Sequence, residues 1–310
     1  MSDRPEREHE QSHRPGPRFT VIVPTYNRPA QLAACVGALR ALDRPGGTLE
    51  IVIVNDGGRP PAVEVVRTSS AEPNLEIRVV EQRNGGPGAA RNAGAAAARG
   101  EWLAFTDDDC LPDSRWLTAF DAALRAAPSS LVGGRTVNAL SDDVFADASQ
   151  SLVDFAASYF DGGATGRFFT SNNLAVAREA FLAAGGFDPR FAICAGEDRE
   201  FSDRWSAQGR PSVSAPDALV RHAHHLSLRR FVRMHFTYGR GAVTFRRVRA
   251  EAGRPVRIDP AFYVRSLAYA LRAGGRRAPM RAIGHALAHV AYAAGLFWES
   301  RRHATGEPAR

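Results

Sequence analysis

Residues 19–25 have the sequence Phe-Thr-Val-Ile-Val-Pro-Thr, and Tyr-Asn-Arg-Pro follows at 26–29. A short, continuous apolar run that ends at a proline predicts a β-strand buried on both faces. The residues from 29 to 42 then have the apolar spacing of a helix. A buried strand that passes through a short polar segment into a helix is typical of an α/β fold.

The same pattern of strand and helix recurs up to residue 105. Apolar runs predict further strands at 49–54, 75–80 and 102–105, and helices are expected near 61–68 and 88–99. Buried strands that alternate with helices indicate a mostly parallel sheet covered on both faces. Ligands of such sheets bind beyond the carboxyl ends of the strands.

The rest of the chain is less regular. The residues predict strands at 131–137 and 217–220, strand pieces at 168–171 and 174–176, and helices at 147–159, 178–184 and 197–208. From residue 226 the chain is expected to be mainly helical. We therefore expect a disordered tail at 1–18, an α/β domain at 19–225 whose two halves meet near residue 110, and a helical extension at 226–310.

The charge of the chain is unevenly distributed. All 40 basic side chains are arginines, which excludes Schiff-base lysine chemistry and a P-loop lysine. Residues 1–220 hold 22 Arg against 29 Asp and Glu, whereas residues 221–310 hold 18 Arg against four acids. A basic C-terminal third favours an anionic partner such as phospholipid headgroups, although solvated helix faces give the same pattern.

The sequence favours a cytoplasmic location. Three cysteines, Cys35, Cys110 and Cys194, are too few and too scattered for a disulfide framework, and the N-terminal residues contain no apolar signal segment. The apolar run at 283–298 is about 16 residues long, below the roughly 20 that span a bilayer. Flanking arginines make it a packed or interfacial helix, and peripheral contact with the inner face of the plasma membrane is an open alternative.

Polar residues follow each strand of the first half. The second strand is followed by Asn-Asp-Gly-Gly at 55–58, the third by a glycine-rich segment at 84–94, and the fourth by three aspartates at 107–109. Three like charges at a strand end resist burial, so a counter-charge is needed, and a divalent cation carrying a phosphorylated ligand would supply it. A solvated acidic turn that caps a helix is the alternative.

These motifs, in this order, resemble those of the family 2 glycosyltransferases from about residue 19 to about residue 241. The resemblance rests on the following segments: Val-Pro-Thr-Tyr-Asn-Arg-Pro at 23–29, Val-Asn-Asp-Gly-Gly at 54–58, Asn-Gly-Gly-Pro-Gly-Ala-Ala-Arg-Asn at 84–92, Thr-Asp-Asp-Asp at 106–109, Gly-Gly-Phe-Asp at 185–188 and Gly-Glu-Asp at 196–198. It implies a GT-A fold with a nucleotide-binding half at about 19–110 and an acceptor half at about 111–225. The absence of a Gln-x-x-Arg-Trp motif favours the non-processive bacterial type.

The resemblance also implies roles for individual residues. The nucleotide-sugar site would contain Pro24, Thr25, Tyr26, Asn27, Arg28, Asp56, Asn84, Gly85, Gly86, Arg91, Asp107 and Asp108. The metal would bind to Asp109 and Asp107 of the Asp-x-Asp motif and to His222, with His224 and His225 as alternatives to the histidine. Asp198 is the expected general base, and the like charge of Glu197 would raise its pKa toward the working pH.

The resemblance thus implies a metal-dependent, inverting glycosyltransferase. The donor would be a nucleotide-diphosphate sugar, most often a UDP-sugar in the family, the cofactor Mg²⁺ or Mn²⁺, and the acceptor a glycan, a lipid-linked group or a small molecule rather than nucleic acid. The family's Asp-Asp-Gly-Ser motif has Asn55 in place of its first acid, which leaves the base of the donor open. A catalytically inert nucleotide-sugar-binding or scaffold protein and a nucleotidyltransferase are the alternatives.

Overall fold

The computed structural model of the chain describes residues 16–67, 72–160, 167–191, 195–256, 259–272 and 274–305. Most of the tail expected at 1–18 and the thiol of Cys194 lie outside these residues. The strands are β1 (Phe19–Thr25), β2 (Leu49–Asn55), β3 (Leu75–Glu81), β4 (Trp102–Phe105), β5 (Cys110–Pro112), β6 (Leu131–Asn138), β7 (Leu174–Ala177) and β8 (Ser212–His222). The helices are α1 (Pro29–Arg40), α2 (Ala62–Arg67), α3 (Pro87–Ala97), α4 (Trp116–Ala126), α5 (Val144–Phe160), α6 (Arg178–Ala183), α7 (Glu197–Ala207), α8 (Leu228–Glu251), α9 (Pro260–Arg272) and α10 (Ala278–Thr305).

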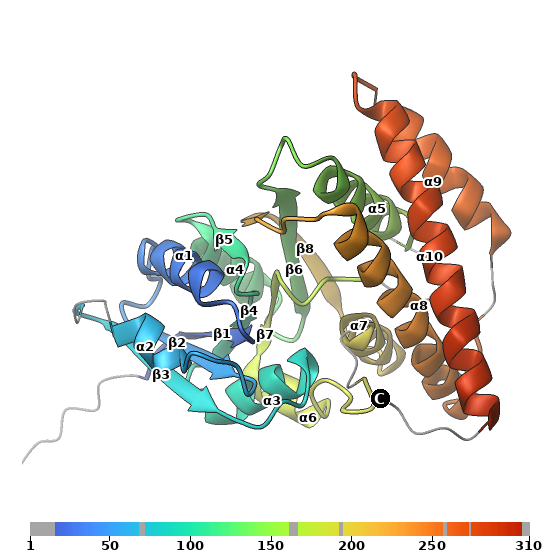
Figure 1. Cartoon of the computed structure of the whole chain (residues 1–310). Helices are drawn as coiled ribbons and strands as arrows, with labels where there is room; N and C mark the ends of the chain where they lie inside the picture. Colours follow the sequence, from blue (N-terminus) through green and yellow to red (C-terminus); the bar gives the residue numbers. More distant parts are fainter. Residues whose placement is uncertain are drawn as a thin grey trace, which may run out of the picture.

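All eight strands form one sheet, in the order β3-β2-β1-β4-β7-β6-β8-β5 (Figure 1). Strands β1 to β4 are parallel to one another, and β7 joins β4 in the antiparallel direction. The parallel register pairs Thr25 with Asn55 at the carboxyl ends of β1 and β2. The predicted α/β class is therefore confirmed, and the polar segments after β1, β2 and β4 share one edge of the sheet.

The two faces of the sheet are covered by different helices. On one face Val21 and Val23 of β1 pack in a core that includes residues of α1 and α4. Ile22, between them, points to the other face and joins a core that contains residues of α3, α6 and α7. A Cβ on Gly94 of α3 would lie 2.5 Å from Ile22 Cγ2, so this glycine allows the helix to approach the sheet closely.

Two expectations for the second half of the domain need correction. Residues 168–171 form no strand, because Phe169 packs over Gly133 of β6 while the backbone N–H of Phe169 bonds to Ser202 Oγ instead of a strand. The strand expected at 217–220 is longer and extends over β8, which carries β5 on its other edge.

The C-terminal region packs as a layer of long helices, α8, α9 and α10, with α5 against it (Figure 1). Helices α8 and α10 touch through their backbones. A Cβ on Gly239 of α8 would lie 1.9 Å from the carbonyl oxygen of Tyr292, and a Cβ on Gly295 of α10 would lie 1.9 Å from that of Phe236. Among the described residues, no helix combines the length and the apolar character that crossing a membrane requires.

Candidate active site

Each of the three aspartates after β4 has its own cationic or hydrogen-bonding partner. Asp107 Oδ1 accepts a hydrogen bond from Arg91 at 2.5 Å. Asp108 Oδ2 accepts one from Thr25 Oγ1 at 2.8 Å, and Asp108 Oδ1 one from Arg28 at 3.2 Å. Asp109 accepts from the same Arg28 guanidinium at 2.9 Å. The protein thus offsets much of the acidic charge with its own side chains, which the sequence did not predict.

The differing surroundings of Asp108 and Asp109 move their pKa values in opposite directions. Burial raises the pKa of Asp108 to about 6, against the opposing charge of Arg28. Burial acts in the same direction on Asp109, but the hydrogen bond from His222 and the charges of His222 and Arg28 outweigh it and hold the pKa of Asp109 far below its usual range. Asp109 is therefore anionic at neutral pH and available to a cation.

Asp109, His222 and His224 form a cluster that could hold a metal ion. Their ligand atoms all lie within 4.8 Å of one another, and His222 Nε2 is 3.2 Å from Asp109 Oδ1. Two ligands at right angles, each about 2.1 Å from an ion, are about 3 Å apart, so the spacing fits. Burial and the charge of His222 lower the pKa of His224 to about 4, which leaves its imidazole neutral, as a metal ligand must be. Asp109 raises the pKa of His222 against the effect of burial, so His222 has to release its proton when it binds an ion.

The structure separates the three neighbouring histidines. Strand β8 ends at His222 and is paired in register with Cys110, which brings His222 beside Asp109. His224 follows on the same side, with its ring centroid 5.1 Å from that of His222. His225 points elsewhere, because its Nδ1 lies 2.7 Å from Asp143 and most of its side chain is exposed.

Arg91 of α3 joins the aspartates to the start of α7. One terminal nitrogen donates to Asp107 Oδ1, and the other donates to Glu197 Oε1 at 3.0 Å. The guanidinium is buried, and the charges of Asp107 and Glu197 raise the pKa of Arg91 against the effect of burial. The structure therefore directs Arg91 to two carboxylates, although the sequence suggested a nucleotide base or phosphate as its partner.

Arg91→Met is expected to destabilise the protein by about 3 kcal/mol, because it leaves the buried carboxylate of Glu197 and the partly buried carboxylate of Asp107 without their shared cation. Urea unfolding would measure the loss. The matched control is Arg125→Met, which removes an exposed arginine from its i,i+4 pair with Asp121; because Asp121 keeps Arg18 as a partner, the loss should be less than about 1 kcal/mol. Equal losses in the two variants would contradict the structural role given to Arg91.

Asp198 lies in the first turn of α7, after Gly196 with φ 96°. Its Oδ1 accepts a hydrogen bond from the backbone N–H of Arg199 at 2.8 Å, and its Oδ2 accepts one from Ser171 N at 3.4 Å. Burial raises the pKa of Asp198 to about 7, and the charge of Glu197 adds to the rise. The side chain has the pKa of a base that works near neutral pH.

Asp56 organises the glycine-rich segment after β3. Its Oδ1 accepts hydrogen bonds from Gln82 Nε2 at 2.6 Å and from Gly85 N at 2.8 Å, and its Oδ2 accepts one from Gly86 N at 2.9 Å. Asn84 donates to the backbone carbonyl of Asp56. A hydrogen bond from a nucleotide to Asp56 would therefore add to the hydrogen bonds that Asp56 already accepts within the protein. Gln82 contacts this candidate site residue, although the sequence analysis did not name Gln82.

The residues after β1 form the rim of the same edge. Pro24 and Thr25 are buried in the strand, whereas Tyr26 is 49% exposed. Asn27 has φ 56°, and its Oδ1 accepts a hydrogen bond from Arg59 N at 2.7 Å. An exposed aromatic ring beside a Gly-rich loop offers a stacking surface for a base.

Tyr238 of α8 is a further site residue that the sequence analysis did not assign. Burial and the negative charges of Asp198 and Glu197, and then of Asp107, raise the pKa of its phenol, although 41% of the residue is exposed. The phenol is therefore protonated at neutral pH, within the electrostatic reach of these acids. No local pattern marks it, because α8 reaches the site only through the packing of the whole helix.

Comparison with known proteins identifies the family of the chain. Residues 20–185 match the family model described as glycosyl transferase family 2. Glycosyltransferase AglE of Haloferax volcanii is 34% identical over 119 residues, which are 38% of this chain and 39% of that protein. Validoxylamine A glucosyltransferase of Streptomyces hygroscopicus subsp. limoneus is 29% identical over 71% of this chain and 57% of that protein. The matches thus span under two thirds of these relatives.

A solved structure shares the fold. The mannosyltransferase PcManGT from Pyrobaculum calidifontis, in complex with GDP-Man and Mn²⁺, has a TM-score of 0.62 and 22% sequence identity, over 91% of this chain and 88% of that one. The likeness supports the GT-A architecture predicted from the sequence. Since the family model covers more than half of the chain and the fold agrees, the chain belongs to glycosyl transferase family 2.

Proposed function

We propose that the protein transfers a sugar from a nucleotide-diphosphate sugar to an acceptor hydroxyl with inversion at the anomeric carbon. The observation that carries the proposal is Asp198, a partly buried carboxylate whose pKa is raised to about 7 and which is tied to the acidic cluster through Glu197 and Arg91. A carboxylate whose pKa is raised by burial and by a neighbouring like charge is a candidate acid–base residue.

In the proposed reaction Asp198 takes the proton of the acceptor hydroxyl while that oxygen forms a bond to the anomeric carbon. The bond between this carbon and the diphosphate oxygen breaks on the opposite face, and the nucleoside diphosphate leaves with the electron pair. Tyr238 can donate a hydrogen bond near the acids. A bound divalent cation would neutralise charge on the departing diphosphate.

The donor set suggests which cation fits. Asp109 offers a carboxylate, and His222 and His224 offer two imidazoles. Imidazole ligands favour transition metals, whereas Mg²⁺ prefers oxygen ligands alone, so we propose Mn²⁺ ahead of Mg²⁺. Asp107 was expected as a metal ligand, but its nearest described partner is Arg91, and we assign it to the donor sugar or ribose instead.

The donor is the least constrained part of the proposal. The family resemblance favours UDP, a solved TarS structure that shares the fold contains UDP-GlcNAc, and PcManGT contains GDP-Man. Asn55, which stands in place of the usual first acid, donates to Glu81 and to the carbonyl of Gly58. We therefore propose a UDP-sugar as the donor. Activity with a GDP-sugar instead would show that the nucleobase of the donor is guanine and not uracil.

Thermal shift and hydrolysis assays with a panel of nucleotide sugars test the function. A UDP-sugar with Mn²⁺ is expected to raise the melting temperature, because binding to the folded state stabilises it, and to be hydrolysed slowly without acceptor. Mg²⁺ should give a smaller response. Stabilisation without any turnover across the panel would favour an inert binding protein, and pyrophosphate release from a nucleoside triphosphate would favour a nucleotidyltransferase.

A further inference from the structure

The outer face of α10 is apolar along most of the helix. Every exposed residue between positions 279 and 298 is apolar: Pro279, Met280, Ile283, Ala286, Val290, Ala293, Ala294, Phe297 and Trp298. At 3.6 residues per turn these positions fall within an arc of about 140°, on the side opposite the residues that pack on the protein. Val290 is 68% exposed and Trp298 is 55% exposed. Solvent contact over such a row is unfavourable, so this face is expected to have a partner.

Helix α9 lies against α10 and has exposed apolar residues of its own (Figure 1). Val264 and Leu271 are seven positions apart, so they lie on the same side of α9, and both are more than half exposed. We call the exposed apolar residues of α9 and α10 the outer apolar face. Most of the large hydrophobic side chains that are exposed in the described part of the chain belong to it.

Arginines border the outer apolar face. Arg276 is exposed at the start of α10, and Arg301 stacks on Phe297 near its end, with its guanidinium carbon 4.9 Å from the ring centroid. On α9, Arg265 and Arg272 are exposed beside the apolar row. Neither α9 nor the first 21 residues of α10 contain an acidic residue, and Glu299 is buried against Arg240.

From this combination we infer that the outer apolar face docks on the surface of a membrane that contains anionic lipids. A helix that is apolar on one side and bordered by arginines lies in the interface, where apolar side chains enter the lipid and arginines meet the headgroups. The 20 residues from 279 to 298 extend over about 30 Å, which allows a broad contact parallel to the surface. The helix rests on the bilayer and does not cross it.

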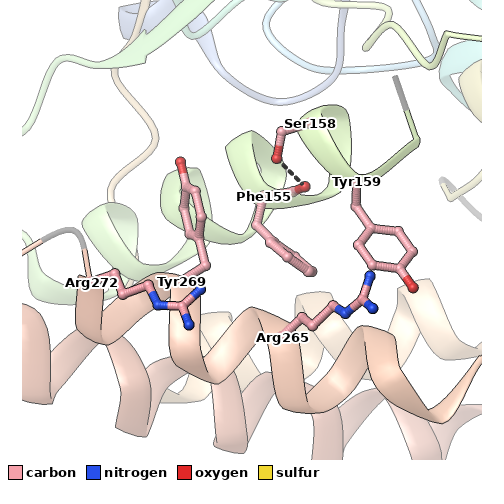
Figure 2. A pocket seen from close by; sticks show the side chains of 6 residues that line it. All are labelled: Phe155, Ser158, Tyr159, Arg265, Tyr269 and Arg272. Atoms are coloured by element: carbon pink, nitrogen blue, oxygen red, sulfur yellow. Dashed lines mark hydrogen bonds between the residues drawn. The ribbon is translucent and has the colours of Figure 1, made fainter. Parts of the chain in front are cut away.

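A cleft between α5 and α9 adds a place for a headgroup. Its volume is about 560 Å³, and its lining residues are Phe155, Ser158, Tyr159, Arg265, Tyr269 and Arg272 (Figure 2). The two arginines lie one heptad apart on α9 and flank the aromatic walls. Aromatic rings at the level of the headgroups and guanidinium groups for phosphate are the features of an interfacial site.

The charge of the face argues against a second copy of the chain as its partner. A symmetric contact between two such faces would bring the arginines of α9 and α10 near one another, and residues 221–310 carry 18 Arg against four acids. An anionic bilayer instead complements this charge, because its headgroups attract each arginine near the surface. The partner is therefore a lipid surface and not another positive protein face.

Intrinsic fluorescence provides a direct test, because the chain has four tryptophans and only Trp298 is exposed, while Trp102, Trp116 and Trp205 are buried. Acrylamide quenching should therefore report mainly on Trp298. Vesicles of phosphatidylcholine with phosphatidylglycerol are expected to reduce the quenching several-fold, and phosphatidylcholine alone to reduce it far less. Unchanged quenching with the anionic vesicles would overturn the proposal.

A pair of variants separates this face from the rest of the surface. Val290→Asp with Phe297→Asp should weaken binding to the anionic vesicles by about tenfold for each side chain, measured by flotation. The matched control, Val63→Asp with Leu182→Asp, changes exposed apolar residues of α2 and α6 and should bind as the parent does. Equal binding to the vesicles by the parent and both double variants would contradict the inference. So would a parent that sediments as a dimer and becomes monomeric only when Val290 and Phe297 are replaced.

Discussion

Asp198→Asn is expected to lower kcat for sugar transfer by about 10²- to 10⁴-fold, the range contributed by a positioned general base. The substitution keeps the shape of the side chain, and its amide oxygen can still accept the hydrogen bond from Arg199 N. Donor binding should change little, because Asp198 acts on the acceptor. A steady-state assay with saturating donor, together with a thermal shift titration of the nucleotide sugar, measures the two effects separately.

The pH dependence of the parent and the variant gives an independent signature. Because the pKa of Asp198 is raised to about 7, the parent should lose activity as the pH falls below 7 and the base becomes protonated. The stability changes in the opposite direction: a raised carboxyl pKa makes the folded state bind more protons than the unfolded state between about pH 4 and 7, so this group destabilises the fold as the pH rises. Asp198→Asn should lack that contribution and unfold at an equal or higher temperature at pH 8.

The control is Asp217→Asn, the same change at an exposed position of β8. It should leave both kcat and its pH profile as they are in the parent. If Asp198→Asn keeps the parental kcat, or if its rate shows the same loss below pH 7, another group is the base and the proposed mechanism is wrong.

Asp109→Asn is expected to abolish the response to Mn²⁺ and to lower transfer by about a hundredfold or more, because it removes the only carboxylate of the metal cluster. The effect should be large at every working pH, since His222 and Arg28 keep the pKa of Asp109 far below its usual range. The Mn²⁺-dependent rise in melting temperature with donor present is the second readout, and it does not depend on turnover.

The neighbouring histidines provide a matched pair of controls. His224→Asn should raise the Mn²⁺ concentration needed for half-maximal activity, whereas His225→Asn should not, because His225 is turned toward Asp143. Chelation should leave the fold of the parent intact, since Arg28, Arg91 and His222 already offset the aspartates. An unchanged metal response in Asp109→Asn would rule out this metal site.

The first half of the fold could be predicted because three of its strands contain a run of apolar residues, while β3 alternates apolar and charged residues. The runs at 19–23, 49–54 and 102–105 correspond to β1, β2 and β4. Strand β5 gave no such signal, because it is three residues long and exists through its pairing with β8, more than 100 residues later. The segment at 168–171 has the composition of a strand but forms none. Its Phe169 ring packs directly over Gly133 of β6 instead, which the local sequence does not indicate.

For the candidate site, the sequence could indicate which residues lie near the same edge of the sheet, but not which partners their side chains bind. Residues after β1, β2 and β4 had to converge at one edge of the sheet, and Asp198 and the aspartates were identified from motifs. The partner of Arg91 depends on α7 lying next to α3, which no local pattern encodes. The same holds for Tyr238, and for the difference between His224 and His225, which depends on where β8 ends.

The glycine contacts between α8 and α10 limit how far the enzyme can be shortened. Gly239 and Gly295 leave no side chain between the two helices, so removal of α10 would expose bare backbone on α8 rather than a surface suited to water. Tyr238 is next to Gly239 and would lose its support at the same time. We therefore expect a truncation at residue 225, the end of the α/β domain expected from the sequence, to remove Tyr238 and the helices that pack on α5, and so to lower the stability of the protein.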